Sequence, residues 1–208
     1  DFHWIAESKN KGVFAVGDCT GHGVPGAFLS ILGITLLNEL VNLEGITRSD
    51  LLINRFQGKL ANALRHTGSE YMASDGIDIS LCVIDRESYR IQFTGAMNDL
   101  VFIRHNQLDV LRANRITVSS GFDEPELFTQ QEFEYRKGDM IYLYSDGYPD
   151  QFGGPRDKKF TSRRMHALML EIAELPMDEQ RQLLSRRLEE WMKGYSQTDD
   201  ITVMGVRL

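Results

Sequence analysis

The order of helical and strand-like segments constrains the fold of this chain most. Two helical stretches, 24–42 and 51–66, precede an unbroken series of strand-like segments between residues 76 and 146. A third helical stretch, 161–193, then precedes a final strand. Parallel sheets require a helix or another long crossover between successive strands, and this series offers none. We therefore predict an α+β fold in which antiparallel sheets stack on each other with helices outside.

The strand-like segments read as hairpins separated by polar turns. Residues 76–96 predict a hairpin that turns near 86–88, and residues 100–112 predict another that turns at Asn106 and Gln107. Residues 127–147 predict two more strands with a turn at 137–139. Two further strands are expected at "GVFAVGDC", which has the composition of a buried strand, and at the C-terminal "DITVMGVRL".

Two of the predicted helices differ in their apolar patterns. The helix at 24–42 carries apolar side chains nearly all round, which predicts burial, and Pro25 suits its first turn. The next helix places Leu52, Phe56 and Leu60 on one face. The third helical stretch is expected to break at Pro176, where a new helix begins.

Length and composition favour one soluble domain spanning residues 1–208. A chain of 208 residues with 42% hydrophobic content can bury a sizeable core without a metal or a disulfide. The net charge of −7 argues against nucleic acid as a partner. Cys19 and Cys82 lie in apolar strand-like runs without paired spacing, so we expect reduced thiols and a cytoplasmic location. No apolar run of about 18 residues predicts direct membrane contact.

Several carboxylates stand where predicted strands begin or end. Asp18 and Asp146 each end a strand-like run, and Asp199 with Asp200 opens the last one. If the sheets bring these ends together, the carboxylates cannot all remain ionised without a cation. Oxygen ligands favour Mg²⁺ or Mn²⁺ over zinc. Turn chemistry explains "SDG" and "TDD" equally well, so the pattern alone leaves metal binding open.

Three sequence blocks, taken in order, resemble a known family. "GDCTGHGVPGAFLS", "MIYLYSDGYPD" and "TDDITV" look like the signature blocks of the SpoIIE-type bacterial branch of the PPM (protein phosphatase 2C-like) metal-dependent serine/threonine phosphatases. "FTGAMNDLVFIR" resembles a further block that reads Ala-Gly-His-Asn-Pro in many relatives, with Met97 at the histidine. The resemblance covers nearly the whole chain. It implies a four-layer α-β-β-α sandwich and two Mg²⁺ or Mn²⁺ ions, with a third left open.

The resemblance also implies roles for individual residues. The ligands would be the carboxylates of Asp1, Asp18, Asp146 and Asp199 and the backbone carbonyl of Cys19. Asp18 would bridge the metals as the central catalytic residue, and hydroxide would attack the phosphorus without a cysteine nucleophile. Supporting roles would fall to Gly21, His22, Gly147 and Asp200. For His22, a structural role and a general-acid role both stay open.

The implied substrate is a small bacterial signalling protein of the STAS, anti-sigma-antagonist type, phosphorylated on serine or threonine. Relatives are often output domains, so we expect the C-terminal output domain of a longer, membrane-anchored sensor, with a homodimer as an open arrangement. One alternative is a catalytically weak or dead domain that serves as a regulatory binding module. Another keeps the metal centre but acts on a small phosphoester.

Overall fold

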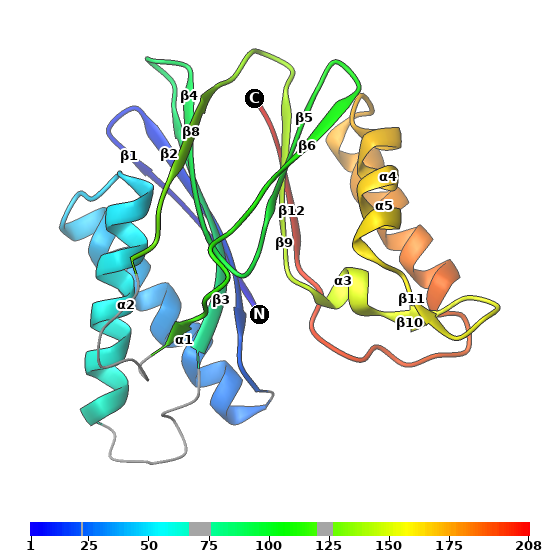
Figure 1. The fold of residues 1–208 in the computed structure, drawn as a ribbon, viewed down its shortest axis with the longest axis horizontal. Coiled ribbons are helices and arrows are strands. Elements are labelled where there is room, and N and C mark those ends of the chain that lie inside the picture. The colour runs from blue at the N-terminus through cyan, green and yellow to red at the C-terminus, as the bar shows by residue number, and fades with distance from the viewer. Residues whose placement is uncertain (22, 67–75, 120–126) are drawn as a thin grey trace.

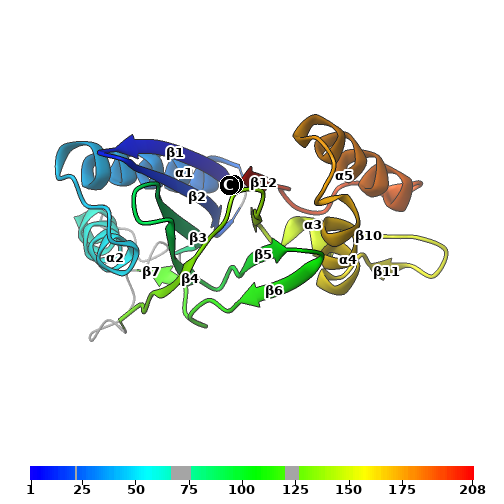
Figure 2. The ribbon, with the colours of Figure 1, turned by 90° about the horizontal axis from the view of Figure 1, so that it is seen from above.

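The fold is a stack of four layers, in which helices cover the outer face of each of two β-sheets (Figure 1). The computed structural model describes residues 1–21, 23–66, 76–119 and 127–208. The view from above shows the helices α1 and α2 on one side of the stack and α4 and α5 on the other (Figure 2). The predicted α-β-β-α sandwich is thereby confirmed.

The larger sheet has the strand order β1-β2-β3-β4-β8, with β7 added beside β3. Every pairing in it is antiparallel. Its strands are β1 (Phe2–Ser8), β2 (Lys11–Cys19), β3 (Gly76–Asp85), β4 (Arg90–Ala96), β7 (Val118–Ser119) and β8 (Gln131–Glu134).

The smaller sheet has the order β12-β9-β5-β6 and is also antiparallel throughout. Its strands are β5 (Leu100–Arg104), β6 (Gln107–Leu111), β9 (Met140–Tyr144) and β12 (Val203–Arg207). A separate two-stranded ribbon pairs β10 (Phe152–Gly153) with β11 (Lys158–Lys159).

The helices fall into two groups, one for each sheet. The larger sheet is covered by α1 (Val24–Asn38), the π-helical turn η1 (Glu39–Leu43) and α2 (Ser49–His66). The smaller sheet is covered by α4 (Ser162–Ile172) and α5 (Met177–Met192), and α3 (Gly147–Asp150) follows β9 directly. The break predicted at Pro176 is confirmed, because α5 starts at the next residue.

Alternation along the strands generates three separate apolar layers. In β3, Leu81 and Val83 face the helices, whereas Cys82 and Ile84 face the other sheet. In β9 the same alternation sends Ile141 between the sheets, while its neighbours on the strand pack under α4 and α5. These strands are buried on both faces, so both sets of alternating residues are apolar and the sequence shows a continuous apolar run.

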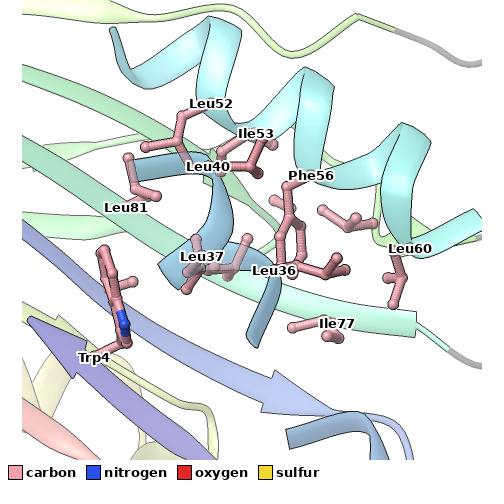
Figure 3. Packing of buried hydrophobic residues seen from close by; sticks show 14 of the residues in the cluster. Trp4, Leu36, Leu37, Leu40, Leu52, Ile53, Phe56, Leu60, Ile77 and Leu81 are labelled. Atoms are coloured by element: carbon pink, nitrogen blue, oxygen red, sulfur yellow. The ribbon is translucent and has the colours of Figure 1, made fainter. Parts of the chain in front are cut away.

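The helix-facing core under α1 and α2 is the largest of these layers. Figure 3 shows Leu37 and Leu40 packed with Phe56 of α2 above β3. Trp4 of β1 lies in the same cluster and donates a hydrogen bond from its indole Nε1 to Asn38 Oδ1 at 3.1 Å. The predicted apolar face of α2 is confirmed, since Leu52, Phe56 and Leu60 are fully buried.

The prediction that the first helix is buried all round is wrong. Val24, Phe28 and Ile31 are 83%, 43% and 66% exposed, so α1 packs through one face only. By length and hydropathy alone, residues 24–43 would suffice to cross a membrane. Leu29 and Leu37 of this segment are fully buried in the core beneath α2, which is the packing of a core helix.

Of two predicted turns, one needs correction and one is confirmed. The β5–β6 turn is formed by His105 and Asn106, both at positive φ, and Gln107 already belongs to β6. Positive φ at both central residues suits the right-handed twist of a two-residue hairpin. The predicted turn at 137–139 is confirmed between β8 and β9, and it joins strands of different sheets, because β8 pairs with β4 whereas β9 pairs with β5 and β12.

Candidate metal centre

The site forms where β2 of the larger sheet and β9 of the smaller sheet end beside each other. Asp18 is the penultimate residue of β2, and Asp146 lies two residues beyond β9. The side chains of Asp18 and Asp146 lie within hydrogen-bond reach of each other, so the two strand ends converge. Residues 128 positions apart in the chain thus line one cavity, which meets the condition that the strand-end pattern had left open.

A cavity of about 600 Å³ opens at this junction. Its lining is almost entirely oxygen-bearing: Asp1, Asp18, Cys19, Thr20, Gly21, Asp78, Thr117, Asp146, Gln197, Thr198, Asp199 and Asp200. No lysine, arginine or histidine side chain lines it within the described part of the chain. The cavity therefore presents concentrated negative charge.

Charge crowding changes the proton affinity of these acids. Burial raises the pKa of Asp18 to about 7, with further contributions from the negative charges of Asp146, Asp199 and Asp78. The pKa of Asp146 is also raised, first by desolvation and then by Asp150 and Asp199. Carboxylates held this close resist simultaneous ionisation unless a positive charge lies between them.

Ser145 ties the two strands of the smaller sheet to Asp1. This fully buried serine donates a hydrogen bond from Oγ to Asp1 Oδ2 at 2.6 Å and accepts one from the Thr202 N–H at 3.0 Å. Its own N–H bonds the Thr202 carbonyl at 3.0 Å. Asp1 is consequently fixed at the cavity by β9 and the start of the last strand.

Asp199 lies on the exposed loop that precedes β12. Its Oδ1 accepts a hydrogen bond from the Asp200 N–H at 2.8 Å, and the residue lines the cavity. Gln151 holds this loop from the other side, because its Oε1 accepts the Thr198 N–H and its Nε2 donates to the Ser196 carbonyl. Sequence reasoning missed Gln151. Its full burial marks it as a structural residue, but burial is known only from the structure.

Gly147 permits the loop that carries Asp199 and Asp200 to approach Asp146. A Cβ at this position would lie 2.0 Å from the Asp200 carbonyl oxygen, far inside any tolerable contact. Gly147 begins α3 and so follows Asp146 directly. The supporting role predicted for Gly147 and Asp200 corresponds to this backbone contact, which holds Asp146 and Asp199 on one side of the cavity.

The turn after β2 depends on Gly21 and Gly23, which both have positive φ and so adopt a conformation that favours glycine. Gly26 packs so closely on the Gly21 carbonyl that a Cβ there would lie 2.6 Å from it. His22 lies outside the described residues. The Cys19 thiol accepts a hydrogen bond from Ser30 Oγ at 3.4 Å, and burial raises its pKa, so it stays a protonated core group.

Sequence reasoning also missed Asp78, which lines the cavity from β3. It is the direct cross-strand partner of Asp18 in the β2–β3 register. Desolvation raises its pKa, a hydrogen bond from the Thr117 side chain lowers it in part, and the charge of Asp146 raises it further. One signal was present in the sequence: a single acid inside the otherwise apolar run "GIDISLCVI".

Several polar residues near the signature blocks lie outside the cavity lining. Asp150 accepts a hydrogen bond from Lys159 at 2.6 Å. The Arg164 guanidinium lies over the Trp191 ring, 4.4 Å from its centroid. Asn98 donates from Nδ2 to the backbone carbonyl of Asp78 at 3.4 Å, which connects the "GAMNDL" block to the site.

The donor set fits a hard divalent cation. Carboxylate, hydroxyl and carbonyl oxygens suit Mg²⁺ or Mn²⁺, and one Asp78 carboxylate oxygen, Oδ1, is buried without a hydrogen-bond partner. Within the described ranges, no three acid, histidine or cysteine side chains stand close enough to hold an ion as they are oriented. The acids must therefore come closer together before three of them can hold one ion.

The fold and the carboxylate cavity together define a PP2C-type phosphatase domain, and comparisons with known proteins agree. The family model for stage II sporulation protein E (SpoIIE) matches residues 8–208. This chain therefore belongs to the SpoIIE family and is a hydrolase of the serine/threonine phosphatase class. No curated protein matches the sequence. Asp1 precedes the matched range.

Three solved structures are similar over nearly the whole chain. The SiaA-PP2C domain of Pseudomonas aeruginosa has a TM-score of 0.89 and 25% identity, covering 100% of this chain and 80% of that one. A Bacillus subtilis SpoIIE structure with the phosphatase domain and a regulatory fragment has a TM-score of 0.77 and 20% identity, covering 100% and 58%. RsbX in complex with magnesium has a TM-score of 0.65 and 14% identity, and the match covers 98% of this chain and 84% of RsbX.

Proposed function

We propose that this domain hydrolyses phosphoserine or phosphothreonine on a small STAS-type signalling protein, with two Mg²⁺ or Mn²⁺ ions held by the carboxylate cavity. The convergence of Asp18 and Asp146 from two different sheets carries the proposal. Like-charged groups brought together by the fold cost stability, so their juxtaposition needs a compensating cation.

The metal ligands in this proposal are Asp1, Asp18, Asp146 and Asp199 with the Cys19 carbonyl. When bound, the ions supply positive charge for the phosphoryl oxygens and lower the pKa of a water nucleophile. Asp18, whose carboxyl group lies near those of Asp146, Asp199 and Asp78, would be the central ligand. Ser145 and Gly147 hold Asp1 and the Asp199 loop in reach of it. RsbX was solved with magnesium, which supports the choice of ion.

A phosphorylated protein is the substrate that suits this cavity. The cavity is open, acidic and without a basic side chain among the described residues, so it has no groups of its own to bind the phosphates of a nucleotide. Similar structures include SpoIIE, described as a cell fate determinant, which supports a signalling protein as partner. We further propose that the domain works in the cytoplasm as the output domain of a longer sensor.

Phosphate release from a serine-phosphorylated STAS protein tests this proposal. The assay compares Mn²⁺, Mg²⁺ and chelator for the unaltered domain, Asp18→Ala and the control Asp109→Ala, an exposed strand acid away from the site. Release that requires metal, is lost in Asp18→Ala and persists in Asp109→Ala is the expected result. Equal release in the presence of chelator, or by Asp18→Ala, refutes the metal mechanism.

A second function is favoured by the spacing of the acids. Asp199 Oδ1 accepts the Asp200 N–H and Asp1 Oδ2 accepts the Ser145 hydroxyl, and among the described residues no three acids stand close enough to hold an ion without rearrangement. A catalytically weak domain that acts as a regulatory binding module would show this arrangement permanently. Stoichiometric binding of the phosphoprotein with no release from it or from an aryl phosphate, at saturating Mn²⁺, supports this alternative.

A further inference from the structure

Asp78 lies directly opposite Asp18 on the neighbouring strand, and apolar packing gives no reason for two acids at these positions. The two residues are direct partners in the antiparallel β2–β3 register. Directly opposed side chains in such a pair have Cβ atoms about 5 Å apart, and two like charges there destabilise the sheet. Both residues line the same cavity.

The surroundings of Asp78 satisfy only part of its carboxylate. Thr117 provides one hydrogen bond to the side chain. Oδ1 is buried and has no partner among the described residues. A buried oxygen without a partner costs about 1–3 kcal/mol, and more when it is charged. The usual neutralising group, a lysine or arginine, does not line this cavity in the described ranges.

The backbone around Asp78 is held in place. The Asn98 side chain bonds its carbonyl at 3.4 Å, and Thr20 pairs with Gly76 through both its N–H and its hydroxyl at 3.0 Å. The Asp78 carboxylate is therefore presented to the cavity by a fixed strand, in contrast to Asp199, which lies on an exposed loop.

We propose that Asp78 is a further metal-binding residue of this domain, which contributes its carboxylate to the divalent cation on the Asp18 side of the cavity. The proposal rests on the proposed function, because it assumes a metal centre there. It goes beyond that function by adding a ligand from the middle of the larger sheet. The cross-strand acid pair is then unstable without the ion and stable with it.

Isothermal titration with Mn²⁺ tests the proposal without relying on activity. Four proteins are compared after removal of metal: the unaltered domain, Asp78→Asn, Asp18→Asn and the control Asp109→Asn. Loss of a residue in or beside a metal shell typically weakens affinity about 10- to 100-fold, which is the expected effect of Asp78→Asn. The same affinity and stoichiometry in Asp78→Asn and the control overturn the proposal.

Thermal unfolding separates a metal ligand from a structural acid. In metal-free protein, Asp78→Asn removes like-charge repulsion and should raise the melting temperature, while saturating Mn²⁺ should raise it less than in the unaltered domain. If Asp78 only accepts the Thr117 hydrogen bond, which the asparagine oxygen can also accept, the melting temperature without metal and its gain with Mn²⁺ should both match the control Asp109→Asn.

The same experiments distinguish the two proposals from each other. If the unaltered domain binds no Mn²⁺, the metal centre and the role of Asp78 both fail. If the unaltered domain binds Mn²⁺ and Asp18→Asn does not, while Asp78→Asn binds normally, the metal centre stands and only the inference about Asp78 falls.

Discussion

Replacement of Gly147 by alanine should disable the site while leaving the fold intact. The new Cβ would lie 2.0 Å from the Asp200 carbonyl oxygen and 3.2 Å from a side-chain carbon of Ile201. Gly147 does not have a positive φ, so alanine can adopt its backbone conformation. The effect of the substitution therefore comes from the contact of the new Cβ with Asp200. The loop must move by about 1.4 Å to restore ordinary van der Waals contact.

That displacement moves Asp199 away from Asp146, because Asp199 precedes the displaced residue. A misplacement of about 1 Å in a catalytic group can reduce the rate about 100-fold, which corresponds to roughly 2.7 kcal/mol of transition-state stabilisation. We therefore expect kcat/KM of Gly147→Ala to fall by about two orders of magnitude at saturating Mn²⁺. The assay is phosphate release from the phosphoprotein and, in parallel, from an aryl phosphate.

Gly58→Ala is the matched control. Gly58 lies on the exposed side of α2, and a Cβ there meets no atom within 4 Å. Alanine in a helix interior stabilises by roughly 0.5–1 kcal/mol relative to glycine, so this variant should be slightly more stable and fully active. If Gly147→Ala retains kcat/KM within about twofold of the control, the position of the Asp199 loop does not limit the reaction and the reasoning is refuted.

Three other predictions concern stability. Asp139 is buried and binds Arg104 through both carboxylate oxygens. Asp139→Ala leaves the Arg104 charge uncompensated and should lower the free energy of unfolding in urea by roughly 3 kcal/mol, and adding Arg104→Met should recover part of that loss. If the double variant recovers nothing, the uncompensated charge is not the cause. Burial and, second, the charge of Arg112 lower the pKa of His166 in the folded protein. The unfolded chain therefore binds the proton more readily, and the free energy of unfolding should fall as the pH decreases from about 6.5 through the lower folded-state pKa. A His166→Gln variant should flatten this dependence, and an unchanged slope contradicts it. Mn²⁺ at 100 times its Kd should stabilise the domain by about 2.7 kcal/mol, reversibly with chelator, and a similar gain in Asp18→Asn would contradict the ligand role of Asp18.

Local patterns were sufficient to predict much of the fold. The run of strands between 76 and 144 showed its hairpins because each strand alternates between two apolar layers and each turn carries polar residues. The break at Pro176 followed from a rule about one residue. The burial of α1 was mispredicted because its apolar residues surround the helix, so nothing in the sequence tells Leu29, which is buried, from Ile31, which is exposed.

The candidate site was predictable only where its residues stand at strand ends. Asp18 and Asp146 are marked by the glycines that follow them, and the structure brings them together. Asp78 lacks such a mark, because it lies inside a strand and reaches the cavity through a register set by the pairing of β2 with β3. The contact between Gly147 and Asp200 joins segments 53 residues apart, and no spacing rule anticipates it.

The placement of the acids divides the site into a rigid part and an adjustable part. Asp18 and Asp78 stand on central strands of the larger sheet, and Ser145 fixes Asp1 to the smaller one. Asp199 is exposed, and among the described residues its carboxylate bonds the N–H of its own loop at Asp200, so it can turn without breaking a strand pairing. Completion of the proposed metal shell then depends on this loop, whose backbone at Asp200 contacts Gly147.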